Sequence, residues 1–255
     1  MGFAPEALSR DRFLGGALEI IQPQTGYRAG VDPVLLAASV PAEPGQSVLE
    51  LGCGVAVASL CLGKRVGGLA LSGIELQADY AGLAVQNAAS NDLRMAVFQA
   101  DLRNLPDDLR ALRFDHIIAN PPYFSRATGT ASANPGRDVA FAGDTPLEDW
   151  VAVAAKRLLP RGYLSVIVDI RRLPELLCAV APRLGSIELQ PLAARRGRAP
   201  HLLLMRARKG GRAAFIQHFP LVMHEGDRHT RDGESYTAQF RAILRDGAAL
   251  PFGTG

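Results

Sequence analysis

Short apolar runs alternate with longer amphipathic stretches through most of the chain, a pattern typical of strands that alternate with helices. The apolar runs predict buried strands at residues 47–51, 69–74, 95–99, 114–119 and 163–168. The stretches between and after them predict helices at 57–66, 77–89, 145–159 and 173–180. Strands separated by helices of this length form parallel βαβ units, so we expect an α/β fold with a doubly wound, Rossmann-like sheet.

The two ends of the chain fall outside this repeating pattern. Two final strands of the core are expected at 186–192 and 201–208, joined by an Arg-rich connection; the sheet is mostly parallel and its last strand antiparallel. We also expect short elements in the flanking segments: strands at 18–22 and 215–223, and a helix at 236–245. The whole chain is then one domain, divided into an N-terminal segment (1–46), a core (47–208) and a C-terminal extension (209–255).

Composition excludes several classes of protein. No apolar run approaches the ~20 residues that a membrane helix needs, and charged residues interrupt the apolar positions of the N-terminus, unlike a signal peptide. Cys53, Cys61 and Cys178 are sparse and form no CxxC pair, which argues against a disulfide framework or a zinc site. We therefore expect a cytoplasmic protein that holds no metal and contacts no membrane.

Charge is distributed unevenly along the chain. The net charge is only +3, but residues 183–212 hold eight basic residues and one acid, a local charge of +7, which leaves −4 for the rest. Such an asymmetry predicts a polyanionic partner on one face of the molecule. An ordinary solvated basic surface gives the same pattern and stays open as the alternative.

Polar and glycine residues follow the predicted strands at the points where a doubly wound sheet binds its ligands. Gly52 and Gly54 form a tight turn after the first strand, which allows a ligand to approach the backbone closely. Glu75 ends the second strand, where an acid can accept hydrogen bonds from both ribose hydroxyls of a nucleoside. Asp101 follows the third strand and can accept from an adenine amino group. Together they predict a nucleoside site at this edge of the sheet.

Asn120-Pro121-Pro122-Tyr123 directly follows the fourth strand. The two prolines prevent both helix and strand from continuing and hold the backbone in an extended shape. The Asn120 side chain and the Pro121 carbonyl are then able to accept hydrogen bonds from one planar amino group, while Tyr123 stacks on the ring that bears it. This motif predicts chemistry on an amino nitrogen.

These residues, in this order and spacing, resemble class I S-adenosylmethionine-dependent methyltransferases that act on planar amino nitrogens. The resemblance covers about residues 47–168 and departs from the family at Ala56, where a third glycine is common. It implies S-adenosylmethionine as the cofactor and Asn120, Pro121, Pro122 and Tyr123 as the catalytic residues. It also implies a cofactor site made of Glu50, Gly52, Cys53, Gly54, Glu75, Leu76, Asp101, Leu102 and Asn120.

A second resemblance narrows the substrate. Residues 26–37, Gly-Tyr-Arg-Ala-Gly-Val-Asp-Pro-Val-Leu-Leu-Ala, are similar to the segment that precedes the glycine turn in the bacterial tRNA1(Val) adenine-37 N6-methyltransferase family. The resemblance implies tRNA as the partner and places Arg28 and Asp32 near the methionine end of the cofactor. It implies that basic side chains hold the RNA phosphates: Arg195, Arg196 and Arg198, with Arg126 and Arg137 from the polar stretch after Tyr123.

Other functions fit the same motif. A protein glutamine N5-methyltransferase also acts on a planar nitrogen, although such enzymes usually carry a helical N-terminal domain, and here only 46 strand-like residues precede the core. An rRNA guanine N2-methyltransferase stays open, and a DNA adenine methyltransferase normally needs a recognition domain for which this chain has little room. A binding module on an inactive methyltransferase fold is the non-enzyme alternative, which the intact Asn120–Tyr123 motif disfavours.

Overall fold

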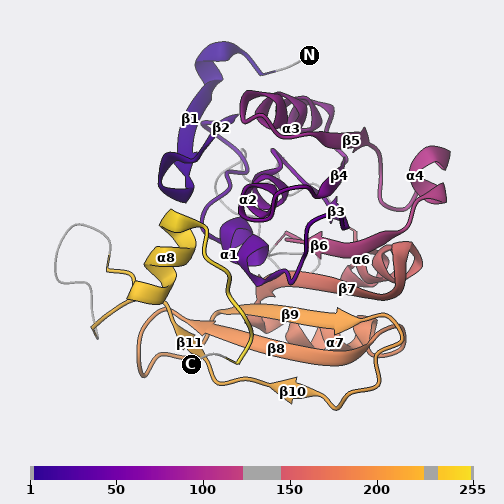
Figure 1. Ribbon diagram of the computed structural model, residues 1–255, viewed down its shortest axis with the longest axis vertical. Helices are drawn as coiled ribbons and strands as arrows, with labels where there is room; N and C mark the ends of the chain where they lie inside the picture. The colour runs from indigo at the N-terminus through magenta and orange to yellow at the C-terminus, as the bar shows by residue number, and fades with distance from the viewer. Residues whose placement is uncertain (1–2, 123–144, 227–234, 254–255) are drawn as a thin grey trace, which may run out of the picture.

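One large sheet organises the molecule (Figure 1). The computed structural model describes residues 3–122, 145–226 and 235–253. The nine-stranded sheet has the order β10-β8-β9-β7-β6-β3-β4-β5, and β11 pairs with β8 further along the edge that β10 occupies. Its strands are β3 (Ser47–Leu51), β4 (Ala70–Glu75), β5 (Met95–Gln99), β6 (Phe114–Ala119), β7 (Leu158–Asp169), β8 (Gly185–Ala193), β9 (Leu202–Arg208), β10 (Ile216–Gln217) and β11 (Leu221–Val222).

The strand directions confirm the predicted doubly wound sheet. Strands β5, β4, β3, β6 and β7 are all parallel, whereas β9 lies between β7 and β8 and is antiparallel to both. From β3 the chain proceeds outward through β4 to β5 and then returns to β6 on the other side of β3. The order of strands therefore reverses at β3, and a ligand cleft is expected at the carboxyl ends of β3, β4 and β6.

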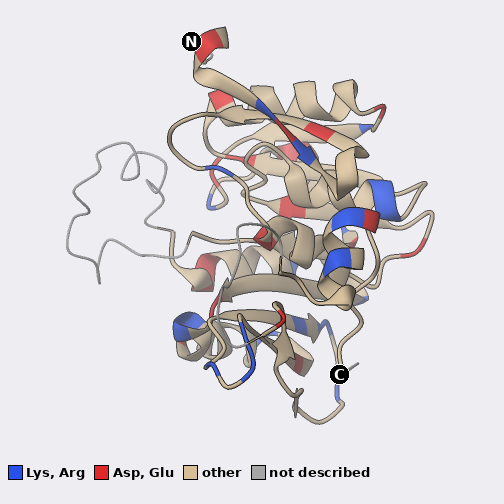
Figure 2. Cartoon of the chain, turned by 90° about the vertical axis from the view of Figure 1, so that its left-hand side faces the viewer, with Lys and Arg blue, Asp and Glu red and all other residues tan. Residues whose placement is uncertain are grey.

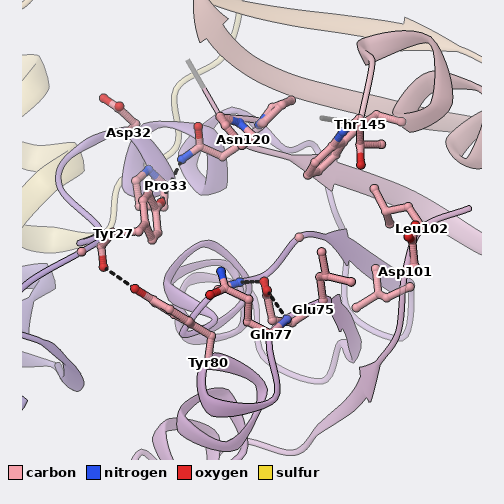
Figure 3. Close-up of a pocket in the computed structure, with 18 of the residues that line it drawn as sticks. Tyr27, Asp32, Pro33, Glu75, Gln77, Tyr80, Asp101, Leu102, Asn120 and Thr145 are labelled. Atoms are coloured by element: carbon pink, nitrogen blue, oxygen red, sulfur yellow. Dashed lines mark hydrogen bonds between the residues drawn. The ribbon is translucent and has the colours of Figure 1, made fainter. Parts of the chain in front are cut away.

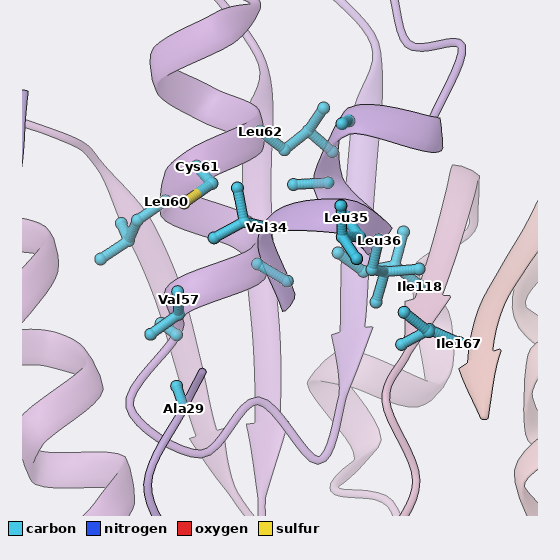
Figure 4. Packing of buried hydrophobic residues seen from close by; sticks show 14 of the residues in the cluster. Ala29, Val34, Leu35, Leu36, Val57, Leu60, Cys61, Leu62, Ile118 and Ile167 are labelled. Atoms are coloured by element: carbon cyan, nitrogen blue, oxygen red, sulfur yellow. The ribbon is translucent and has the colours of Figure 1, made fainter. Parts of the chain in front are cut away.

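Helices cover both faces of the sheet. One face carries α1 (Asp32–Ser39), α2 (Val57–Arg65), α3 (Ala78–Ser90) and α8 (Ala238–Asp246); the other carries α4 (Asp107–Ala111), α6 (Leu147–Arg157) and α7 (Leu173–Val180). Successive residues of a strand point to opposite faces, so Val48 and Ile118 pack in the first core whereas Leu49 and Ile117 pack in the second. Figure 4 shows α1 and α2 packed together over the first face.

The N-terminal segment differs from the prediction. The expected strand at 18–22 is β2 (Leu18–Pro23), but it pairs with β1 (Leu8–Phe13) in an antiparallel hairpin that the sequence does not predict. Four of the six residues of β1 are polar or charged and its only apolar residues are at its ends, so it lacks an apolar run. Long-range hydrogen bonds attach the hairpin to α3: buried Asn87 accepts from the backbone N–H of Ile21 at 2.8 Å and donates to its carbonyl at 2.9 Å.

The C-terminal extension also differs in detail. The predicted strand at 215–223 is two short pieces, β10 and β11, which both pair with β8. Pro220 lies between them and has no N–H to donate, which interrupts the ladder. The predicted helix is α8, which begins after the N-cap Thr237 and ends at Gly247, a residue in the left-handed conformation. Among the described residues, no helix is long and apolar enough to cross a membrane.

Candidate active site

A cavity of about 450 Å³ opens at the carboxyl edge of the sheet, where the strand order reverses (Figure 3). It lies between the glycine turn after β3, the ends of β4 and β6, the loop after β5 and the segment that leads into α1. Its described lining is Gly26, Tyr27, Arg28, Gly30, Asp32, Pro33, Gly52, Gly54, Ile74, Glu75, Leu76, Gln77, Tyr80, Ala100, Asp101, Leu102, Asn120, Pro121, Pro122, Thr145 and Trp150.

The turn between β3 and α2 needs its two glycines. Gly52 and Gly54 have φ of 60° and 54°, in the left-handed region that favours glycine. Ala56 has φ of 70° at the N-cap of α2, so the position where the related family often has glycine takes a glycine-like conformation here too. An alanine in this conformation costs about 1–2 kcal/mol. The backbone is therefore strained at Ala56, which starts α2 from a left-handed conformation.

Glu75 joins the end of β4 to this turn. Its side chain is buried, one carboxylate oxygen accepts from Gly54 N–H at 2.9 Å, and the other accepts from Gln77 N–H at 2.9 Å. Burial raises the pKa of Glu75. Each carboxylate oxygen can accept a second hydrogen bond. The residue is thus fixed in place while it faces the cavity, in the position expected of an acceptor for ribose hydroxyls.

Glu50 and Cys53 do not belong to the described lining, although the resemblance implies both as cofactor ligands. Glu50 is buried, and one of its oxygens accepts from Ser59 N–H at 2.9 Å and from Ser59 Oγ at 2.5 Å. It therefore attaches the first turn of α2 to β3. Cys53 is also buried, and its Sγ would lie 2.8 Å from a Cβ at Gly73. Both residues shape the turn from behind.

Glu50 is expected to make stability pH-dependent. Burial raises its pKa from 4.5 to about 7, so between these values the folded protein holds a proton that the unfolded chain has lost. Raising the pH from 5 to 8 should then lower the free energy of unfolding by about 3 kcal/mol, with the loss complete above pH 7. Urea denaturation across this range should show that Glu50→Gln removes most of the slope. A constant difference between wild type and variant at every pH would contradict this assignment.

The residues that follow β4 and β5 provide a polar and an apolar part of the lining. The Asp101 carboxylate is paired with the Arg103 guanidinium at 2.7 Å and accepts from Arg103 N–H at 2.8 Å, and these bonds lower the pKa of Asp101. Leu76, at 47% exposure, and buried Leu102 add apolar surface beside it. A carboxylate next to two leucines suits a flat base whose amino group needs an acceptor.

Arg28 and Asp32, which the resemblance places near the methionine end of the cofactor, both line the cavity. The Arg28 guanidinium binds the N-terminal hairpin, where it donates to Asp11 at 2.8 Å and to the Pro23 carbonyl at 2.8 Å. It therefore holds the wall of the cavity in place. Asp32 begins α1, and burial raises its pKa.

Asn120 directly follows β6 and faces the cavity together with Pro121 and Pro122. Its Nδ2 donates to the Tyr27 hydroxyl at 3.5 Å, which orients the amide so that Oδ1 is its acceptor atom. Burial raises the pKa of Tyr27, so this phenol stays protonated. Tyr123, Arg126 and Arg137, which were also predicted from the sequence, lie outside the described residues.

Three aromatic residues of the lining were not predicted. Tyr27 bonds Asn120, and its carbonyl accepts from the Tyr80 hydroxyl at 3.3 Å. The Trp150 ring lies against Gly52, where a Cβ would come within 2.5 Å of it. Tyr27 lies in the 26–37 segment quoted above, and Trp150 is the only tryptophan, on the first turns of a predicted helix. The sequence does not show that either side chain lines the cavity, because the contacts of both join segments that are far apart in the chain.

The basic segment 183–212 is divided between two edges of the sheet, which corrects the expectation of one basic face. Since β8 and β9 are antiparallel, their connection lies at the cavity edge, whereas Arg208 pairs with Gly185 at the opposite edge. Arg196 and Arg198 are exposed in the connection. Arg195 instead donates to the carbonyls of Glu225 and Gly226 in the C-terminal extension. Figure 2 shows Lys and Arg interspersed with Asp and Glu over several elements.

The described residues fit S-adenosylmethionine. Gly52 and Gly54 have no side chains and leave the backbone of the turn open to the cavity, and Glu75 and Asp101 provide acceptors at two neighbouring strand ends. Leu76 and Leu102 add apolar surface to the same lining. Within the described part of the chain, no group of three or more His, Cys, Asp or Glu side chains is placed to hold a metal ion.

Comparisons with known proteins agree with this geometry. The family model of the methyltransferase small domain matches residues 29–174. A tRNA1(Val) (adenine(37)-N6)-methyltransferase of Dickeya chrysanthemi is 28% identical over 236 residues, which cover 89% of this chain and 90% of that protein. The protein of the same description from Porphyromonas gingivalis is 32% identical over 191 residues, 70% of this chain and 73% of that protein.

Solved structures give the same fold. A predicted O-methyltransferase from Agrobacterium tumefaciens superposes with a TM-score of 0.71 at 25% identity, covering 88% of this chain and all of that one. A Thermus thermophilus 16S rRNA N2 G1207 methyltransferase in complex with AdoMet and guanosine superposes with a TM-score of 0.53 at 22% identity, covering 79% and 50%. The chain therefore belongs to the methyltransferase small domain family and is an S-adenosylmethionine-dependent methyltransferase.

Proposed function

We propose that the protein methylates the N6 amino group of an adenine in tRNA. The observation that carries this proposal is the position of Asn120, Pro121 and Pro122, which line the cavity at the carboxyl end of β6. The motif suits a planar amino group, and relatives that match about nine-tenths of the chain are described as tRNA1(Val) (adenine(37)-N6)-methyltransferases. A tRNA substrate also implies a cytoplasmic protein.

The residues of the protein orient the substrate amino group toward the methyl group of the cofactor. Bound S-adenosylmethionine supplies a methyl group that its sulfonium already makes electrophilic. The lone pair of an adenine amine is delocalised into the ring, so this nitrogen is a poor nucleophile. Asn120 Oδ1 and the Pro121 carbonyl accept hydrogen bonds from the two amino protons, which favours a pyramidal nitrogen with its lone pair directed toward the methyl group. Catalysis then comes mostly from positioning and electrostatics.

The RNA phosphates are assigned to the cavity edge. Arg196 and Arg198 are exposed there, and the proposed contacts also include Arg195, Arg126 and Arg137. The target base must leave its stack to enter the cavity, which costs least for a base in an anticodon loop.

The proposal is tested by methyl transfer from labelled S-adenosylmethionine to total tRNA, duplex DNA and a release-factor protein, side by side, with nucleoside analysis of the product. We expect label in tRNA, recovered as N6-methyladenosine. Label in protein alone would show that the cavity takes a glutamine amide, and label as N2-methylguanosine would move the activity to guanine. Either result overturns the proposal.

Removal of two cavity-edge charges should weaken RNA binding. In the double variant R196A/R198A, tRNA affinity at low salt is expected to fall by about tenfold or more, and the slope of log K against log salt should decrease by about 1 to 2. The matched control is R94A/R113A, which removes two exposed charges that precede β5 and β6 at the opposite edge. An equal loss of affinity in both double variants would contradict the assignment of the RNA to the cavity edge.

A further inference from the structure

An ion pair between a largely buried arginine and a more exposed glutamate lies next to the Asn-Pro-Pro motif. Arg172 ends the 3-10 turn η3 (Ile170–Arg172) that follows β7, and its guanidinium pairs with Glu175 at 3.0 Å. The Arg172 side chain is only 12% exposed, whereas that of Glu175 is 46% exposed. Arg172 Nη1 donates to the Pro122 carbonyl at 2.5 Å. A charged guanidinium therefore holds the backbone of the motif.

The contact matters because the motif has few other ways to be held. Proline has no N–H, so Pro121 and Pro122 offer only carbonyl oxygens to hydrogen bonding. Their rings also fix φ, so the direction of each carbonyl depends mainly on ψ. A charge-assisted bond to the Pro122 carbonyl fixes the peptide plane that follows the Pro121 carbonyl, the proposed acceptor for the amino group.

Glu175 gives Arg172 a fixed position. Its carboxylate accepts from Arg172 through both Nε and Nη2, at 3.1 and 3.0 Å, so the guanidinium is held in one plane. The same carboxylate accepts from the backbone N–H of Leu147 at 3.2 Å, at the first residue of α6. Trp150, one turn further along α6, lines the cavity. The pair thus connects the motif after β6 with the helix that provides another wall of the site.

We infer that Arg172 is a positioning residue for methyl transfer, which acts by holding the Pro122 carbonyl and thereby orients the acceptors at Asn120 and Pro121. This inference rests on the proposed function, because it assumes that these acceptors bind the substrate amino group. In this role Arg172 itself contacts neither substrate nor cofactor. Its loss should therefore lower kcat much more than it changes either KM or cofactor affinity.

The test compares Arg172→Gln with Arg171→Gln on whichever acceptor the wild-type protein methylates. Arg171 occupies the same turn and binds Asp169 at 2.7 Å, so its variant loses the same charge from the same place. For R172Q we expect kcat to fall by about 100-fold, the size of loss that a small misplacement of reacting groups causes. The Kd of S-adenosylmethionine and the KM of the acceptor should stay within about twofold. Arg172→Lys keeps a cationic donor and should restore part of kcat.

The outcomes separate this inference from the proposed function. Transfer to tRNA with equal kcat in wild type, R171Q and R172Q would overturn the positioning role and leave the proposed function intact. Transfer to a protein amide, with kcat reduced in R172Q alone, would overturn the tRNA substrate and support the positioning role. A wild-type protein that binds S-adenosylmethionine but methylates no acceptor would contradict both. Urea denaturation of each variant ensures that kcat is measured on folded protein; a loss of stability with unchanged kcat would also overturn the inference.

Discussion

Replacing Asn120 with alanine is expected to lower kcat for methyl transfer by about 10² to 10³-fold, a loss typical of removing one preorganised polar group from an active site. Asn120 directly follows β6, and its side chain is oriented by its bond to the Tyr27 hydroxyl and faces the cavity. Without Oδ1 the substrate amine loses one of its two proposed acceptors. The cofactor is expected to stay bound, since Glu75, Asp101 and the glycine turn do not depend on this amide.

Single-turnover kinetics and calorimetric titration with S-adenosylmethionine measure the two effects separately. Asn104→Ala is the matched control, because Asn104 is exposed in the loop after Asp101 and does not belong to the described lining. N104A should retain wild-type kcat. A large drop in cofactor affinity for N120A, with transfer otherwise normal at saturating cofactor, would show that Asn120 binds the cofactor rather than the acceptor.

The core of the fold could be predicted because its central strands β3, β4 and β6 are buried on both faces. Such strands are short, continuous apolar runs, and the polar residues that end them stand out from their neighbours. Glu75, Asp101 and Asn120 were identified in this way, and the structure brings all three to one cavity. The parallel direction of β3 to β7 follows from the helices between them.

The parts that could not be predicted depend on contacts between distant segments. Strand β1 has a polar sequence and exists as half of a hairpin attached to α3 through Asn87. Arg28 lines the cavity, as the resemblance implies, but the sequence does not reveal that its guanidinium also binds Asp11 of the hairpin. The charge of segment 183–212 appeared to form one face, yet the antiparallel turn between β8 and β9 sends its arginines to opposite edges.

Substitution by alanine should be tolerated at one glycine of the cavity lining and not at another. For Gly52→Ala we expect the free energy of unfolding to fall by about 3 kcal/mol, from two independent costs. At φ of 60° an alanine is strained by about 1–2 kcal/mol. Its Cβ would also lie 2.5 Å from Cη2 of Trp150, whose ring is buried in the second core, and such overpacking typically costs about 1–3 kcal/mol.

Gly30→Ala is the control for this prediction. Gly30 lines the same cavity, does not have a positive φ, and has no heavy atom within 4 Å of the place where a Cβ would lie. Urea denaturation should therefore give G30A a stability within about 0.5 kcal/mol of wild type, as for substitutions that create no clash or strain. The cost of G52A should be smaller in the W150L background than in wild type. The smaller side chain at position 150 removes the clash, whereas the backbone strain at position 52 stays. Equal losses in G52A and G30A would show that the cavity responds to any added methyl group, and would remove the turn's conformation as the cause.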